Sequence, residues 1–124
     1  MAVFLRTDNH VNGGERLTQF VESVAEGAVQ HVKRQVTRVD VYLGDENGPS
    51  KTSPHEFRCS MEARIGGLKA LAVTHHAGSI DEAVRGAADK LQSIIDHTMD
   101  KISHKKGRMP SAGDPDAITQ VATI

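Results

Sequence analysis

Residues 57–91, FRCSMEARIGGLKALAVTHHAGSIDEAVRGAADKL, decide the fold, because their hydrophobic pattern changes from a period of two to a period of 3.6. Alternate residues from Phe57 to Ile65 are apolar, which predicts a half-buried strand with one polar face. Gly66 and Gly67 predict a two-residue type I′ turn, because both central positions of that turn need a positive φ. A second strand, Leu68–His75, is therefore expected beside the first and antiparallel to it.

The end of this stretch opens a helix. Ser79 and Glu82 match the Ser-x-x-Glu capping box, in which two side chains satisfy the first backbone N–H groups of a helix. The apolar face that follows continues from Ile80 to Ile102 and predicts a helix that ends near His104. The last turns of this helix are rich in lysine, which suits the negative end of the helix dipole.

An earlier helix is predicted from Glu15 onward. Its apolar residues recur at helical spacing for about twenty residues. Asn12, three residues before Glu15, is the expected N-terminal cap, and Lys33 with Arg34 is expected at the C-terminal end.

Strands are predicted on both sides of this helix. The first is the β-prone run Ala2–Thr7, and the second is the alternating run Thr37–Leu43, which Gly44 is expected to stop. The order is therefore β-α-β-β-β-α, an α+β fold in which two helices pack on one face of a four-stranded sheet. A right-handed crossover would make the first two strands parallel, and the last three would form an antiparallel meander.

Length and composition favour one small domain in a reducing compartment. The 124 residues, 38% of them hydrophobic, predict a domain at 1–106 and a flexible tail at 107–124 that is broken by glycine and proline. The single Cys59 cannot form an internal disulfide, and Met1–Leu5 is too short for a signal-peptide core, so a cytoplasmic protein is expected. Aromatic residues make up only 3%, which excludes a broad platform of base-stacking rings.

The segment Ser79–Leu91, and above all Asp89-Lys90-Leu91, resembles the signature of the ribosome hibernation factors, also called ribosome-associated inhibitors or sigma-54 modulation proteins. This resemblance implies a double-stranded-RNA-binding-like fold. It also implies a protein that binds the small ribosomal subunit, its 16S rRNA and ribosomal proteins, in the mRNA/tRNA channel and inhibits translation under stress or in stationary phase. No cofactor, catalytic residue, small-molecule substrate or membrane comes with the resemblance, and whether the chain forms a homodimer stays open.

Two features depart from the family pattern. The net charge is only -1, whereas family members usually carry an excess of basic residues, and Arg85 stands where an acidic residue is common. The chain also resembles a short form, because the residues after the last helix are too few for the C-terminal dimerisation domain of longer members. A second hypothesis is therefore a protein-binding regulatory module with the same fold that does not bind ribosomal RNA. An enzyme ranks third, because no nucleophile and base stand at a readable spacing.

Binding folded RNA without reading its sequence needs cations that meet phosphates and 2′-hydroxyls. The candidate RNA-binding residues form three groups: the second-helix end, the first-helix end, and two cations along the second helix. They are Lys101, Lys105, Lys106 and Arg108; Lys33 and Arg34; and Arg85 and Lys90. The alternative for each group is a solvated cation favoured by the helix dipole.

Other polar groups favour structural roles. The outer sheet face offers Arg38, Arg58, Arg64 and Lys69, but Asp40, Glu56 and Glu62 interleave with them, which favours cross-strand ion pairs. No metal site is expected, because His75 and His76 would point to opposite faces of a strand and His97 and His104 are too far apart on a helix. Cys59 is expected as a buried small side chain, and Gly13-Gly14 as a flexible turn without the lysine of a phosphate-binding loop.

Overall fold

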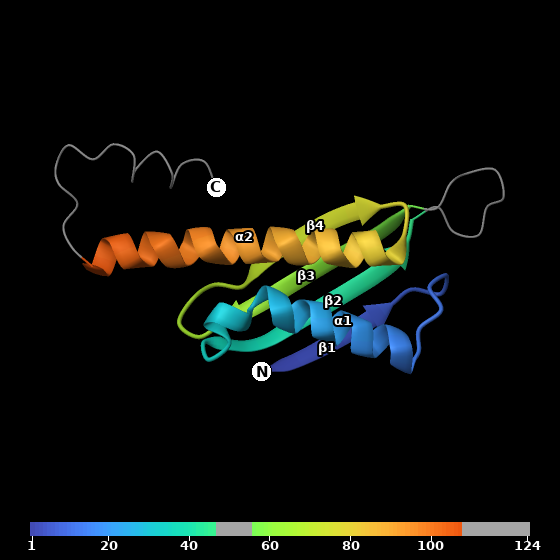
Figure 1. The fold of residues 1–124 in the computed structure, drawn as a ribbon, viewed down its shortest axis with the longest axis horizontal. Coiled ribbons are helices and arrows are strands. Elements are labelled where there is room, and N and C mark those ends of the chain that lie inside the picture. Colours follow the sequence, from blue (N-terminus) through green and yellow to red (C-terminus); the bar gives the residue numbers. More distant parts are fainter. Residues whose placement is uncertain (47–55, 108–124) are drawn as a thin grey trace. The chain divides into compact units, whose positions relative to one another are not determined.

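The computed structural model describes residues 1–46 and 56–107, with side chains described as far as residue 102. The elements along the chain are β1 (Ala2–Thr7), α1 (Glu15–Ala28), the short 3₁₀ helix η1 (Gln30–Val32), β2 (Val36–Asp45), β3 (Phe57–Ile65), β4 (Leu71–Ala77) and α2 (Ile80–Gly107) (Figure 1). The chain divides into two compact units, Met1–Gln92 and Ser93–Ile124, and α2 begins in the first unit and continues into the second. The tail that the sequence predicts after residue 107 lies outside the described residues.

The sheet has the predicted topology. Its strands lie in the order β1-β2-β3-β4, with β1 parallel to β2 and the other two pairs antiparallel. The parallel pair needs a crossover connection, and α1 supplies it. This arrangement confirms the α+β fold that the change of hydrophobic period predicts.

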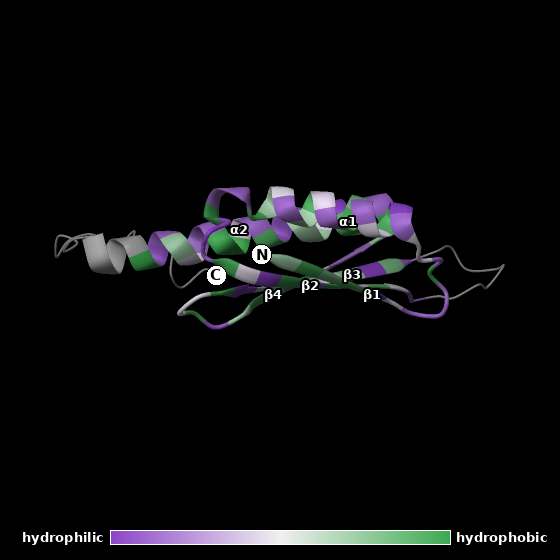
Figure 2. Ribbon diagram, turned by 90° about the horizontal axis from the view of Figure 1, so that it is seen from below, coloured by the Kyte–Doolittle hydropathy of each residue, from purple (hydrophilic) through white to green (hydrophobic). Residues whose placement is uncertain are grey.

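The helices of the first unit cover one face of the sheet, as Figure 2 shows. On the two central strands the residues of that face are buried, among them Leu43, Cys59 and Met61, whereas those of the edge strands β1 and β4 are half-buried. Val21 of α1 and Leu91 of α2 are also fully buried. Burying each large aliphatic side chain stabilises a fold by about 1.5–3 kcal/mol, so this layer between helices and sheet holds the unit together.

The α1 helix is shorter than predicted and is capped differently. It ends at Ala28, because Val29 leaves the helical region with φ -111° and ψ 10°, and the chain then turns through η1. Gly14 occupies the N-cap position without a side-chain cap, so the expected role of Asn12 is wrong. The preceding loop is instead ordered by Asp8, whose carboxylate accepts hydrogen bonds from the backbone N–H groups of His10, Val11 and, across the fold, Asp45.

The turn after β3 and the ends of β2 and β4 also differ from the sequence prediction. The turn after β3 donates a hydrogen bond from Leu68 N to the Ile65 carbonyl at 3.0 Å, and only Gly67 has a positive φ, so it is not a type I′ turn and β4 begins at Leu71. One positive φ at the third position is typical of a type II turn. β2 continues through Gly44 to Asp45, because both residues pair with β3.

The second helix begins as predicted and ends later. The Ser79 hydroxyl accepts from Glu82 N–H and donates to the Glu82 carboxylate, each at 3.1 Å, which confirms Ser79 as the cap. Glu82 contacts the hydroxyl of Ser79 in place of the backbone N–H that a capping box predicts. The helix ends at Gly107 rather than near His104. None of the helices in the described part of the chain has the length and apolar content needed to cross a membrane.

Candidate nucleic-acid interface

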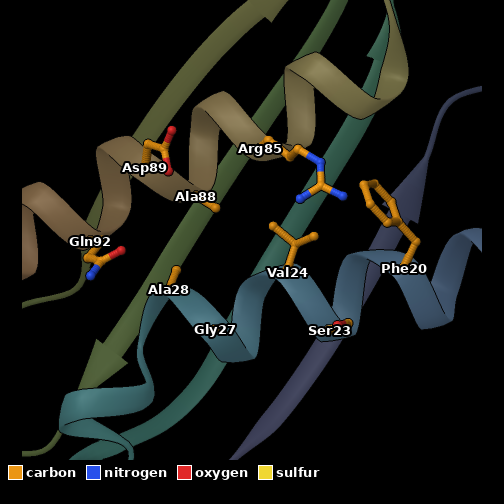
Figure 3. Close-up of a pocket in the computed structure, with 9 residues that line it drawn as sticks. All are labelled: Phe20, Ser23, Val24, Gly27, Ala28, Arg85, Ala88, Asp89 and Gln92. Carbon is orange, nitrogen blue, oxygen red and sulfur yellow. The ribbon is translucent and has the colours of Figure 1, made fainter.

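A groove of about 520 Å³ lies between α1 and the first turns of α2, entirely within the first unit. Figure 3 shows the residues that line it, which are mostly small or polar: Phe20, Ser23, Val24, Gly27, Ala28, Arg85, Ala88, Asp89 and Gln92. Residues three or four positions apart share one helix face, so Ser23 and Gly27 fall on one stripe of α1. Such short side chains cannot fill the space between two helices, and the groove remains open.

Arg85 spans the groove from α2 toward α1. Its Nε lies 2.5 Å from a carboxylate oxygen of Asp81, one helical turn earlier, and its guanidinium carbon lies 5.2 Å from the centre of the Phe20 ring (Figure 3). An aromatic ring attracts a guanidinium that lies over its face. Arg85 is therefore held in place by two neighbours, and Asp81 offsets much of its charge.

Lys90 is held by the sheet. Its Nζ donates a hydrogen bond of 3.0 Å to the main-chain carbonyl of Thr74 in β4. Although the sequence groups Lys90 with Arg85, their side chains have different partners, and Lys90 does not line the groove.

Lys33 and Arg34 follow η1 and are both exposed. With Gln30, His31 and Gln35 they surround a hollow of about 580 Å³. Neither cation has an ion-pair partner among residues 1–46 and 56–102. The sequence predicts these cations at the C-terminal end of the first α-helix. Because α1 has already ended at Ala28, they lie instead in the turn that leads into β2.

The remaining candidate cations belong to the second unit. Lys101 is half-buried on α2, and Lys105 and Lys106 also fall within this helix, although their side chains are not described. Lys101 and Lys105 are four residues apart, so their positions share one helix face. Arg108 lies outside the described residues.

The two ion pairs that arginines form on the outer sheet face run along the strands and not across them, contrary to expectation. Arg38 lies 2.6 Å from Asp40, and Arg64 lies 3.9 Å from Glu62. The register explains the difference, because it sets Arg38 opposite Arg64 and Asp40 opposite Glu62. These four charges therefore pair between residues two apart on one strand. Lys69 precedes β4 and Glu56 precedes β3, so both lie off the strands.

Cys59 and His75 are packing residues in this structure. Cys59 is fully buried, and burial raises the pKa of its thiol from 9.0 to about 12, so the reactive thiolate does not form near neutral pH. The His75 ring lies against the backbone of Gly86 in α2. This contact uses the histidine as a packing group between sheet and helix.

The chain is similar to known proteins over most of its length. Residues 6–103 match the family model described as sigma 54 modulation protein / S30EA ribosomal protein. A search of curated proteins finds no match. Among solved structures, a ribosomal subunit interface protein from Coxiella burnetii is 11% identical with a TM-score of 0.64, covering 80% of this chain and 98% of its own. The N-terminal domain of Protein Y from Thermus thermophilus is 12% identical with a TM-score of 0.58, covering 78% and 94%. At these identities the two structures share the fold.

Proposed function

Since the chain belongs to the sigma 54 modulation protein / S30EA ribosomal protein family, we propose that it binds the small ribosomal subunit in the mRNA/tRNA channel and inhibits translation under stress or in stationary phase. The partner is the 16S rRNA together with neighbouring ribosomal proteins. The shared fold with a ribosomal subunit interface protein supports this proposal.

The observation that carries the proposal is the pair of exposed cations at the end of η1. Lys33 and Arg34 border an open hollow, and no described carboxylate pairs with either of them. A phosphate can therefore approach both cations without first displacing an internal partner. Affinity for RNA then comes largely from the counterions that the phosphates release.

The candidate cations contribute unequally under this proposal. Lys33 and Arg34 contact phosphates directly, and Lys101, Lys105, Lys106 and Arg108 contribute further phosphate contacts of their own. Arg85 presents its guanidinium edge at the groove, while Phe20 and Asp81 hold its orientation. Lys90 contributes least, because its ammonium group already donates to the Thr74 carbonyl.

Co-sedimentation with ribosomes and with isolated small subunits at several salt concentrations tests the proposal. If about five phosphates are contacted, log K falls with log salt with a slope of roughly -4, at about 0.7–0.9 per phosphate. The Lys33→Glu/Arg34→Glu protein should bind at least about tenfold more weakly and should inhibit cell-free translation less. Adding Lys101→Glu, Lys105→Glu and Lys106→Glu should abolish binding and inhibition.

The matched control is Arg64→Glu/Lys69→Glu, which changes the net charge equally on another part of the surface. It should bind ribosomes nearly as the parent protein does. Absence of co-sedimentation even at low salt would refute RNA binding and favour the protein-binding module, which the net charge of -1 permits. Equal losses in the test and control pairs would refute the assignment of the site to Lys33 and Arg34.

A further inference from the structure

The sheet has a face that points away from the helices (Figure 2). A further hollow, of about 360 Å³, lies on this face. Its lining comes from all four strands, so it runs across the sheet and not along one strand. The residues whose side chains belong to this face are Phe4 and Arg6, Asp40 and Tyr42, Arg58, Ser60 and Glu62, and Ala72 and Thr74. The cations to which the proposed function assigns ribosome binding do not line this hollow.

Charge divides this face into two halves. In one half, Arg38 and Arg64 pair with Asp40 and Glu62, so the four charges offset one another. Arg38 also covers the Phe4 ring, with its guanidinium carbon 4.4 Å from the ring centre.

In the other half, Arg6 and Arg58 have no carboxylate partner within the part of the chain that the structure describes. The register places Arg6 opposite Tyr42 and places Arg58 opposite Gly44, two residues further along β2. Two cations therefore flank one tyrosine.

Tyr42 lies along its strand over Gly44. A Cβ at Gly44 would stand 2.8 Å from both the Tyr42 hydroxyl and Asp8 Oδ2 and 3.1 Å from Tyr42 Cε2, so the ring and this carboxylate oxygen occupy space that any larger residue would need. The same Asp8 oxygen accepts a hydrogen bond from Asp45 N–H. Arg58 reaches the ring from the neighbouring strand, with its guanidinium carbon 5.8 Å from the ring centre. Because Gly44 has no side chain, the Tyr42 ring can lie along the strand near Arg6 and Arg58.

We infer that this half of the sheet binds a segment of single-stranded RNA, with one base against Tyr42 and the flanking phosphates on Arg6 and Arg58. A base offers the planar face that stacks on an aromatic ring, and phosphates offer the charge that matches two guanidinium groups. Ser60 and Thr74, whose hydroxyls lie 3.0 Å apart, supply hydrogen-bonding groups for a ribose or base edge. An acidic peptide would match the charge but not the ring.

A strand fits this site better than a separate nucleotide. Pockets for small ligands usually enclose about 70–90% of the ligand surface, whereas this hollow is open along the sheet and reaches β4. A strand that crosses the sheet can add contacts on both sides of the stacked base. The inference does not rest on the proposed function, because its probe is an oligonucleotide and not a ribosome.

The test uses the full chain with a short fluorescein-labelled oligouridylate, followed by fluorescence anisotropy at several salt concentrations. Arg6→Gln/Arg58→Gln should weaken binding at least about tenfold and make the salt slope shallower by about 1.4, at about 0.7 per phosphate on single strands. Tyr42→Leu should weaken binding about tenfold with little change in salt slope. The matched control, Arg16→Gln/Lys69→Gln, removes the same charge elsewhere and should bind within about twofold of the parent.

Tyr42 also gives a direct readout, because it is the only tyrosine in the chain. Its ring-proton NMR signals should move upfield when the oligonucleotide is added, since a stacked base shields them. Equal losses in the two double variants, or tyrosine signals that stay in place, would overturn the inference. Uridine monophosphate that binds as tightly as the oligonucleotide would overturn it too, because the site would then take a free nucleotide. Far-UV circular dichroism shows whether each variant is folded. If Tyr42→Leu does not fold, the Arg6→Gln/Arg58→Gln variant still tests the inference.

Discussion

Replacing Gly86 by alanine should destabilise the protein, although glycine is a poor residue for the middle of a helix. Gly86 lies in α2 against the ring of His75 in β4, and a Cβ there would overlap Cδ2 and Nε2 and stand 2.7 Å from Cγ. Glycine to alanine in a helix normally stabilises by about 0.5–1 kcal/mol. Forcing an extra carbon into a packed contact costs about 1–3 kcal/mol. We therefore expect a net loss of about 1 kcal/mol, and at most about 2.5 kcal/mol, measured by urea unfolding followed by far-UV circular dichroism.

A double-variant cycle separates the two contributions. In the His75→Ala background the ring is absent, so adding Gly86→Ala should stabilise the protein by the helix-propensity gain of about 0.5–1 kcal/mol. The sign of the glycine substitution should thus reverse between the two backgrounds. If Gly86→Ala stabilises the parent protein as well, the close packing of helix on sheet at this point is wrong.

Three further predictions concern the core, a cap and the thiol. Leu91→Ala, at a fully buried position, should cost about 2–5 kcal/mol in urea unfolding, and the folded variant should keep ribosome binding. Ser79→Ala removes the hydroxyl that accepts from Glu82 N–H and should cost about 0.5–2 kcal/mol, which thermal unfolding beside the parent protein would detect. The pKa of Cys59 is raised from 9.0 to about 12, so between these values only the unfolded chain ionises, and stability should fall as pH rises through that window. Urea unfolding of Cys59→Ala across the same pH range should lack this contribution; an identical decline in both proteins would assign it to other groups.

The fold could be predicted from the sequence because each of its elements leaves a local pattern. Alternation from Phe57 to Ile65 and the Ser79 cap depend only on near neighbours, and both are confirmed. The end of α1 could not be predicted in the same way. The apolar spacing continues through Val29 and Val32, both of which are buried, but they reach the core from the turn around η1 and not from the helix.

The candidate sites depend on contacts between elements, which the sequence leaves open. Arg85 and Lys90 are five residues apart, yet one lies over Phe20 and the other binds a β4 carbonyl. The sequence predicts that charged residues of the outer face form ion pairs. It does not predict whether the pairs form within one strand or between strands, because the strand register decides which charges meet. No local signal connects Arg6 with Tyr42 and Arg58, since only the pairing of three strands brings them together.

The hydrogen bond from Lys90 to Thr74 has a consequence for solubility. β4 is the last strand of the sheet, so no strand of residues 1–46 or 56–107 pairs with its outer side. Such edges invite a strand from another molecule, and proteins often protect them with lysine. Because the Lys90 ammonium group occupies a main-chain acceptor of β4, a foreign strand that needed this carbonyl would first have to displace it. Lys90 is therefore placed like the lysines that protect exposed strands in other proteins, and this position needs no RNA to explain it.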